Sequence, residues 1–369
     1  MKPLNPVKMK VAKILQPLWW FIGLFMNDPK SDAAIKSILI FDFHLIGDMV
    51  LLIPLLDGIR TKYPEANVVL VAGPWAQDIV LPSGFIDELI PFSAPWVKYG
   101  QGWGGWASYF SLLRVLRTRS WDMGVEIRGD IRQILLLALA GAKVRVGLDI
   151  TGGGPLLTKV VPIDNKLVHI ADFHKRIGKT MALFSDSTLY HPKLTLTEKE
   201  KIYAKKISPY IGIHFGASVN LRRVPLNKAQ KLLSAIYSLY PDKNYVVFEL
   251  KEDPIFSKEL FKFLNSKTKK IEFWVGGLRD FIVKASCCEH MYAMDSAAAH
   301  ISCALGVKTS VIYGPSNDQL TSPIGENGQI ILVKNKPNCW PCNQRKCIST
   351  ENQACFPEDL SCFRPLVQI

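Results

Sequence analysis

The sequence lacks an uninterrupted hydrophobic run long enough to cross a membrane. Its apolar stretch near the start, residues 14–26, is interrupted by Gln16 and Pro17, whereas a spanning helix needs about 20 apolar residues. No small-x-small cleavage site follows this stretch, which disfavours a cleaved signal peptide. Lysines precede it and Trp19 and Trp20 lie within it, so residues 1–35 are interpreted first as an extension that anchors in the membrane interface. A helix packed on the core is the alternative.

Acidic residues are scarcer than basic ones, with 32 Asp and Glu against 45 Lys and Arg, for a formal net charge of +13. This surplus indicates an anionic partner, either nucleic acid, acidic lipid or a phosphorylated small molecule. The sequence has no block of Lys and Arg interleaved with aromatic residues. We therefore expect no dedicated nucleic-acid face.

Cysteines are absent from the first 286 residues, so the chain has no disulfide framework and we expect a reduced, cytoplasmic protein. Cys287, Cys288 and Cys303 have apolar neighbours and are predicted to be buried thiols. Five more lie near the end of the chain. Four of these have spacing that fits a structural zinc or iron–sulfur site, with free or oxidised thiols and disulfides as the alternatives: Cys339, Cys342, Cys347 and Cys355.

Strand-like and helix-like segments alternate along the rest of the chain. Residues 37–43 predict a strand, and apolar residues then recur at three- and four-residue spacing up to Tyr63, which predicts a helix with one buried stripe. A polar, helical stretch over 169–206 precedes a second series of such units. Strand–helix–strand units of this length imply parallel sheets. We predict an α/β protein with two Rossmann-like domains, residues 36–195 and 196–369, whose parallel sheets face an interdomain cleft.

An aromatic and glycine-rich insert, SAPWVKYGQGWGGW, follows residue 92. It is too rich in glycine for a helix. Trp96, Trp103 and Trp106 are interpreted either as locally packed side chains of a surface loop or as a platform for sugar rings or lipid.

Polar residues follow several predicted strands, at the sheet edge where open α/β folds bind ligands. After the first strand come His44 and then Gly47-Asp48, which opens the next helix. Asp48 is interpreted either as a helix N-cap or as a general base that takes a proton from an acceptor hydroxyl.

The stretch HFGASVNLRRVP, residues 214–225, closes a strand of the second series. Gly216, Ala217 and Ser218 are small enough to let the backbone approach a ligand. Arg222 and Arg223 suit phosphate oxygens, although they could equally be solvated loop arginines.

Residues 294–306, MDSAAAHISCALG, contain a strand that ends at Asp295 and a helix that Ser296 can cap. Ala297 and Ala298 leave the helix N-terminus open to a diphosphate. His300 either reaches the same ligand or is a packed core histidine. In FELKEDP, Glu252 is our first choice to hold ribose hydroxyls, with Glu249 next.

Taken together, these motifs resemble glycosyltransferase family 9, the heptosyltransferases of lipopolysaccharide core assembly. The likeness rests on FHLIGDMVLLIPLL, HFGAS, RRVP and DSAAAHISCALGVKTSVIYGPS, in this order, over about residues 36–362. It implies a GT-B fold with an N-terminal acceptor domain and a C-terminal donor domain. It also implies inverting transfer from a nucleotide-diphosphate sugar, such as ADP-heptose, without a catalytic metal or other cofactor.

The resemblance also implies roles for individual residues. Asp48 is the general base, with Gly47 and His44 on the acceptor side. The residues expected to bind the donor phosphates are Arg222, Arg223, Ser296, Ala297, Ala298 and His300. Those expected to bind the rest of the donor are Gly216, Ala217, Ser218, Glu252 and Asp295. The expected acceptor is a glycolipid at the anionic face of the inner membrane.

The sequence departs from the family pattern at four positions: Arg222 stands for Lys, Val224 for Trp, Ala297 for Gly and His44 for a small polar residue. These leave the donor sugar and the acceptor open. A nucleotide-sugar epimerase of the same architecture and a non-catalytic binding module are the alternative functions.

Overall fold

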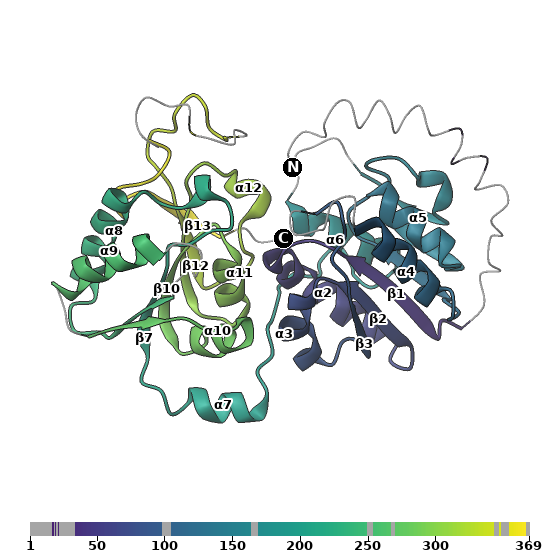
Figure 1. The fold of residues 1–369 in the computed structure, drawn as a ribbon, viewed down its shortest axis with the longest axis horizontal. Helices are drawn as coiled ribbons and strands as arrows, with labels where there is room; N and C mark the ends of the chain where they lie inside the picture. The colour runs from purple at the N-terminus through teal and green to yellow at the C-terminus, as the bar shows by residue number, and fades with distance from the viewer. Residues whose placement is uncertain are drawn as a thin grey trace. The chain divides into compact units, whose positions relative to one another are not determined.

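The computed structural model describes Pro17, Trp19, Phe21 and residues 34–97, 105–163, 169–248, 254–266, 270–342, 347 and 354–366. The chain divides into two compact units, Met1–Tyr190 and His191–Ile369. Figure 1 draws the first from purple to teal and the second from teal to yellow. The division falls five residues before the boundary expected from the sequence. Within the described ranges, no helix has the length and apolar character to cross a membrane.

Unit 1 is built on a six-stranded sheet in the order β3-β2-β1-β4-β5-β6, and every pair is parallel. Parallel strands buried on both faces need continuous apolar runs, and β1 is buried at all but its first residue. The strands are β1 (Ser37–Asp42), β2 (Asn67–Ala72), β3 (Glu88–Pro91), β4 (Met123–Glu126), β5 (Val144–Leu148) and β6 (Lys159–Val161).

The helices of unit 1 cover this sheet: α2 (Ile46–Lys62), α3 (Gln77–Val80), α4 (Trp106–Leu116), α5 (Ile131–Leu139) and α6 (Ile170–Thr180). The prediction of a single buried stripe on α2 is wrong, because all but one of its residues from 49 to 56 are buried. The reason is a second partner: His174 of α6 and Tyr190 both contact the carbonyl oxygen of Leu51, at 3.1 and 2.8 Å. The helix is thus enclosed on its far side as well.

Two tryptophans of the aromatic insert pack locally. The ring of Trp96 lies 5.7 Å from those of both Trp106 and Tyr109, and the guanidinium of Arg132 lies 4.5 Å above it. Trp96 and Trp106 also border the core around Phe43. The local-packing interpretation is therefore confirmed for Trp96 and Trp106, whereas Trp103 lies outside the described residues.

Trp19 of the N-terminal segment is half-buried against a small cluster formed by Ile134 and Ala138 of α5 with Leu156 and Leu157. Phe21, two residues later, is 58% exposed. The segment therefore has one aromatic side chain on the core and one in solvent, and most of it lies outside the described residues.

Unit 2 contains a seven-stranded sheet in the order β13-β12-β11-β10-β7-β8-β9, parallel except for the β12–β13 pair. Its strands are β7 (Tyr210–His214), β8 (Tyr245–Phe248), β9 (Ile271–Trp274), β10 (Cys288–Met294), β11 (Lys308–Ile312), β12 (Gly328–Ile331) and β13 (Phe363–Pro365). The predicted α/β class with parallel sheets is confirmed in both units.

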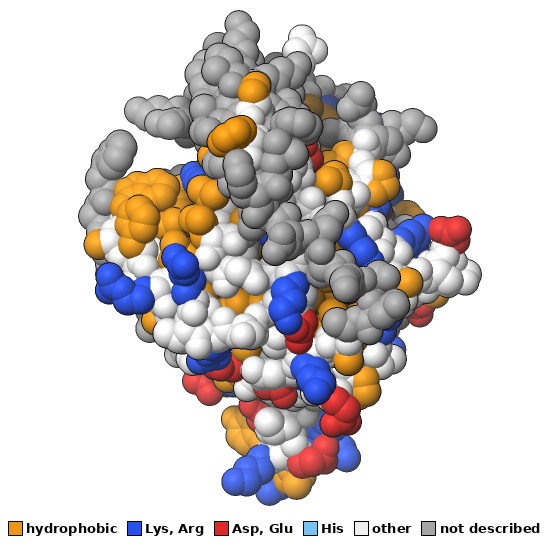
Figure 2. Space-filling view, turned by 90° about the vertical axis from the view of Figure 1, so that its right-hand side faces the viewer, with side chains coloured by type: hydrophobic (Ala, Val, Ile, Leu, Met, Phe, Trp, Pro, Cys, Tyr) orange, Lys and Arg blue, Asp and Glu red, His pale blue; other side chains and the backbone are white. Residues whose placement is uncertain are grey.

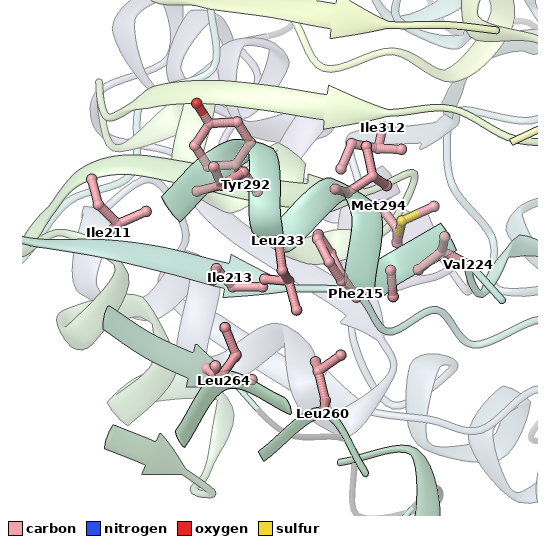
Figure 3. Packing of buried hydrophobic residues seen from close by; sticks show 14 of the residues in the cluster. Ile211, Ile213, Phe215, Val224, Leu233, Leu260, Leu264, Tyr292, Met294 and Ile312 are labelled. Atoms are coloured by element: carbon pink, nitrogen blue, oxygen red, sulfur yellow. The ribbon is translucent and has the colours of Figure 1, made fainter. Parts of the chain in front are cut away.

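The helices of unit 2 are α7 (Glu198–Ala204), α8 (Leu226–Leu239), α9 (Pro254–Asn265), α10 (Leu278–Ala285), α11 (Ala297–Ala304) and α12 (Asp318–Thr321). Figure 3 shows one side of the core, where Ile213 of β7 and Met294 of β10 meet Leu233 of α8 and Leu260 of α9. The expected continuous helical stretch over 169–206 is wrong, because residues 181–197 are irregular between α6 and α7.

The cysteine-bearing tail packs at the end of β11. The indole of Trp340 donates to the carbonyl of Gly314, and the backbone N–H of Cys342 donates to that of Pro315, at 3.1 and 2.8 Å. The buried ring of Phe356 lies so close to Gly314 that a Cβ atom there would meet it at 2.3 Å. The tail is therefore built into the part of unit 2 that carries the YGPS motif.

Candidate functional site

Asp48 lies in the first turn of α2, three residues after the N-cap position Leu45. The helix starts before Gly47, so the N-cap interpretation of Asp48 is wrong. Its Oδ2 accepts a hydrogen bond from the N–H of Leu45 at 3.3 Å, which satisfies one of the donors that every helix start leaves open. The side chain remains 18% exposed, so the carboxylate is held by the backbone without being sealed off.

Arg128 forms an ion pair with this carboxylate, with 2.7 Å between its Nη2 and Oδ1 of Asp48. Arg128 follows β4, which pairs with β1 in parallel. The two strands therefore deliver their following residues to one edge of the sheet. Arg128 is not among the residues predicted from the sequence, because its position beside Asp48 depends on β4 lying next to β1.

Asp42, the last residue of β1, is fully buried beside this pair. Its Oδ1 accepts from the N–H of His44 at 3.0 Å and lies 3.2 Å from Nδ1 of the same histidine. Burial acts to raise the pKa of Asp42, but the hydrogen bond from His44 and the charge of Arg128 outweigh it and leave the pKa below its ordinary value. His44, predicted on the acceptor side, therefore belongs to the same charge cluster as Asp48.

Two further buried groups lie near Arg128. Glu126 accepts from the N–H groups of Arg128 and Gly129 at 2.9 and 2.6 Å. Burial nevertheless raises its pKa to about 8. Burial, with the charge of Arg128, lowers the pKa of His174 to about 4. At neutral pH His174 is accordingly uncharged.

The raised pKa of Glu126 predicts a pH-dependent stability. The native protein holds this proton between the ordinary value of 4.5 and about 8, whereas the unfolded chain releases it. The stabilisation of the native state by this retained proton is therefore full below about pH 4.5 and is lost as the pH rises through about 8. We expect the Tm of Glu126→Gln minus that of the wild type to increase from pH 5 to pH 8.5. Thermal unfolding of both proteins across this range measures it. A Tm difference that is constant over this range would mean that Glu126 is ionised in the native state.

In unit 2 the loop after β7 meets the residue that directly follows β10. These strands are neighbours in the sheet, and Nη1 of Arg222 lies 3.0 Å from Oδ2 of Asp295. Asp295 is 6% exposed and Arg222 is 38% exposed, so the guanidinium is anchored by a buried carboxylate and still reaches solvent. An arginine held in this way is preorganised for an anionic ligand.

The small residues of this loop are placed differently from one another. Gly216 and Ala217 are buried, and Ser218 is exposed. Arg223 donates from Nε to the carbonyl of Ala217 at 2.9 Å. In the structure this contact holds the loop, and the predicted phosphate contact of Arg223 stays a prediction.

α11 begins at Ala297, two residues after Asp295, at the same edge of the sheet. Ser296 occupies the N-cap position, but its side chain makes no capping hydrogen bond and lies 3.5 Å from Nδ1 of His214 instead. Ser296 therefore occupies the predicted cap position but does not make the capping hydrogen bond. Ala297 is half-buried, while Ala298 and His300 are buried in the helix, and the Ser296 side chain leaves the helix N-terminus to a ligand.

Tyr313, which follows β11, is fully buried near Asp295 and Arg222. Burial, followed by the charge of Asp295, raises its pKa well above the ordinary value. Tyr313 is not among the residues predicted from the sequence, because its position depends on β11 lying next to β10.

Two other predictions concern the ribose-binding glutamates and the cysteines. Glu252 and Glu249 lie outside the described residues. In the described part of the tail the five cysteines are free thiols, and no group of three or more His, Cys, Asp or Glu residues there could hold a metal ion. Cys287, Cys288 and Cys303 are buried free thiols, as predicted.

Comparison with known proteins adds the family context. Residues 109–352 match the family described as glycosyltransferase family 9 (heptosyltransferase). This span includes Arg128 and the unit 2 cluster, whereas Asp48 precedes it. Lipopolysaccharide heptosyltransferase 2 of Escherichia coli strain K12 is 23% identical over 317 residues, which cover 80% of this chain and 88% of that protein. Lipooligosaccharide heptosyltransferase 2 of Haemophilus ducreyi is also 23% identical, over 345 residues, with the same coverage of each chain.

Solved structures share the fold. A family 9 glycosyl transferase from Veillonella parvula superposes with a TM-score of 0.68 at 19% identity, over 80% of this chain and 85% of that one. The ADP-heptose lipopolysaccharide heptosyltransferase II of E. coli superposes with a TM-score of 0.64 at 19% identity, over 81% and 91%. The two units with parallel sheets are therefore those of a GT-B fold.

Proposed function

The chain belongs to glycosyltransferase family 9 (heptosyltransferase), and on that premise we propose that it transfers a heptose-type sugar from a nucleotide-diphosphate donor, such as ADP-heptose, to a lipopolysaccharide core or a related glycolipid. That the chain is a glycosyltransferase follows from the family itself. The observation that carries the assignment of roles is the pair of charged clusters at the strand ends, one around Asp48 and one around Arg222 and Asp295. The relatives named for heptose transfer support the choice of sugar.

In the proposed reaction the acceptor hydroxyl attacks the anomeric carbon of the donor sugar and gives its proton to Asp48. The bond between this carbon and the diphosphate oxygen breaks, and the diphosphate leaves with the electron pair. One displacement of this kind inverts the anomeric configuration. Asp48 suits the base because it is held by Leu45 and Arg128 and remains partly exposed.

The leaving diphosphate gains negative charge as the bond breaks, so the site must supply positive charge there. Arg222, fixed by Asp295, and the N-terminus of α11 are two such groups on one sheet edge. We therefore propose that the transfer needs no metal or other cofactor. The described tail cysteines are not grouped as a metal site, so elemental analysis of the purified protein should find no stoichiometric zinc or iron bound there.

The function is tested by incubating the protein with ADP-heptose, with and without a heptose-deficient lipopolysaccharide core, and analysing products by mass spectrometry. We expect a core one heptose heavier, formed only when both substrates are present. Conversion of the donor alone would favour the epimerase, and binding without any product would favour the non-catalytic module. UDP- and GDP-sugars serve as control donors.

The proposed acceptor lies on an anionic membrane at the cytoplasmic face, and α4 supports such a partner. This helix exposes Phe110 and Val115 together with Arg114, has Arg117 directly after it and contains no acidic residue. Figure 2 shows hydrophobic side chains gathered beside Lys and Arg on the face that it views. Exposed aromatic and cationic side chains together favour the interface of an anionic bilayer.

We expect the protein to sediment with vesicles of anionic lipid and not with phosphatidylcholine alone. The triple variant Phe110→Ser, Arg114→Gln, Arg117→Gln should lose at least half of this binding. The matched control, Ile202→Ser, Lys199→Gln, Lys205→Gln, removes one exposed apolar and two cationic side chains at α7. Equal losses in the two variants would contradict a role for α4.

A further inference from the structure

The contact between Arg128 and Asp48 is not an ordinary surface ion pair. The side chain of Arg128 is 9% exposed and that of Asp48 is 18% exposed, whereas exposed pairs gain little because water screens them. At 2.7 Å in this setting, the guanidinium acts on the carboxylate with little screening. Arg128 therefore acts directly on whatever chemistry Asp48 performs.

Both oxygens of Asp48 have a separate partner. Oδ1 faces Nη2 of Arg128, and Oδ2 accepts from the N–H of Leu45. Each carboxylate oxygen can accept more than one hydrogen bond. The two contacts therefore fix the direction of the carboxylate and leave it able to accept a proton.

Arg128 also interacts with a second carboxylate, that of the fully buried Asp42. The other ionisable groups around it are His44, which bonds Asp42, Glu126 at the end of β4, Asp130 at the start of α5 and His174 on α6. His174 is uncharged at neutral pH, and Glu126 is largely protonated. Arg128 thus pairs directly with Asp48 of α2 and also acts through its charge on the buried Asp42 of β1.

The cluster keeps hydrogen-bonding capacity that a purely structural ion pair would use. In the described part of the chain, Nε and Nη2 of Arg128 and Oδ2 of Asp42 are buried and make no hydrogen bond of regular geometry, although Nη2 lies 2.7 Å from Oδ1 of Asp48 as an ion pair. Buried polar atoms of this kind are uncommon and call for a reason. A guanidinium that pairs with Asp48, acts through its charge on Asp42, and can change in its effect on each supplies one.

We propose that Arg128 is the positioning residue of Asp48, which it orients and keeps ionised, and that Asp42 sets how strongly it does so. This rests on the proposed function, in which Asp48 is the base. In the transfer step the proton of the acceptor hydroxyl passes to Asp48 as the new glycosidic bond forms. Arg128 itself neither takes up nor gives up a proton in this step.

The positive charge of Arg128 determines the direction in which the pH profile of kcat should move when it is removed. Removing the cation with Arg128→Met makes Asp48 easier to protonate, so the acid limb of the kcat profile moves to higher pH, by about one unit or more. At pH 6 the variant loses at least tenfold in kcat while the KM for ADP-heptose stays within twofold. Arg128→Lys keeps the charge and holds the limb near its wild-type position. Asp42→Asn removes the competing anion and moves the limb to lower pH.

The control is Arg145→Lys, at a second buried arginine of unit 1 that donates to the carbonyls of Leu156 and Ala142 at 2.5 and 2.7 Å. It should lower Tm and leave the pH profile unchanged. An unmoved acid limb in Arg128→Met, with activity that follows Tm, would overturn the proposal. If that variant does not fold, Asp42→Asn decides, and a limb that stays or rises overturns the proposal as well. Full transfer activity in Asp48→Asn would instead refute the base itself, so the two failures can be told apart.

Discussion

Asp48→Asn should abolish glycosyl transfer, lowering kcat by about 10²- to 10⁴-fold, the range that a positioned general base contributes. The amide retains the size of the side chain and can still accept from the N–H of Leu45, which Oδ2 of Asp48 does at 3.3 Å. It cannot take the proton of the acceptor hydroxyl. The affinity for the nucleotide-sugar donor, measured by isothermal titration, should change less than twofold, because the donor groups proposed here lie in unit 2.

Asp57→Asn is the matched control, an exposed aspartate of the same helix, and it should retain wild-type kcat. Since Asp48→Asn also leaves Arg128 without its anionic partner, Tm is measured for both variants. A variant at position 48 that keeps a tenth or more of the wild-type turnover would show that another group removes the proton.

Arg222→Met should weaken binding of the nucleotide-diphosphate donor by about 10- to 100-fold, because a hydrogen bond to a charged group contributes about 1.5–3 kcal/mol. The guanidinium is 38% exposed and lies 3.0 Å from the buried Asp295, so it is fixed on one side and open on the other. We expect kcat to fall as well, because the charge of the leaving group grows as the bond breaks. Titration calorimetry with ADP-heptose, and with ADP alone, measures the binding effect.

Lys206→Gln, at an exposed lysine of the same unit, controls for loss of one positive charge. Arg222→Lys should fall between the wild type and Arg222→Met, because it keeps the charge but not the planar fork. Wild-type affinity in Arg222→Met would show that Arg222 does not bind the donor. The N-terminus of α11 would then remain as the proposed phosphate-binding group.

Local patterns were sufficient to predict parallel sheets and the strands after which Asp48, Arg222 and Asp295 follow in the chain. A run of apolar residues followed by a glycine or a small residue marks the end of a buried parallel strand, and such ends lie at one edge of the sheet. β1 ends at Asp42 and β10 at Met294, each one residue before its predicted end.

Arg128 and Tyr313 could not be found in this way. Their importance depends on β4 lying beside β1 and on β11 lying beside β10, and strand order is not encoded in local periodicity. The first turn of α2 was misplaced for a different reason. Gly47 was interpreted as the hinge before the helix, whereas α2 begins at Ile46 and the glycine lies within its first turn. Glycine at that position costs little helix stability, so it is a weak boundary signal.

The most direct test of the account is the anomeric configuration of the product. A single displacement with Asp48 as base requires the new glycosidic bond to have the configuration opposite to that of the donor. The one-bond carbon–proton coupling at the anomeric position, measured by NMR on the core extended with 13C-labelled heptose, distinguishes the two. We predict inversion. Retention of the donor configuration would contradict the mechanism and the role of Asp48 with it.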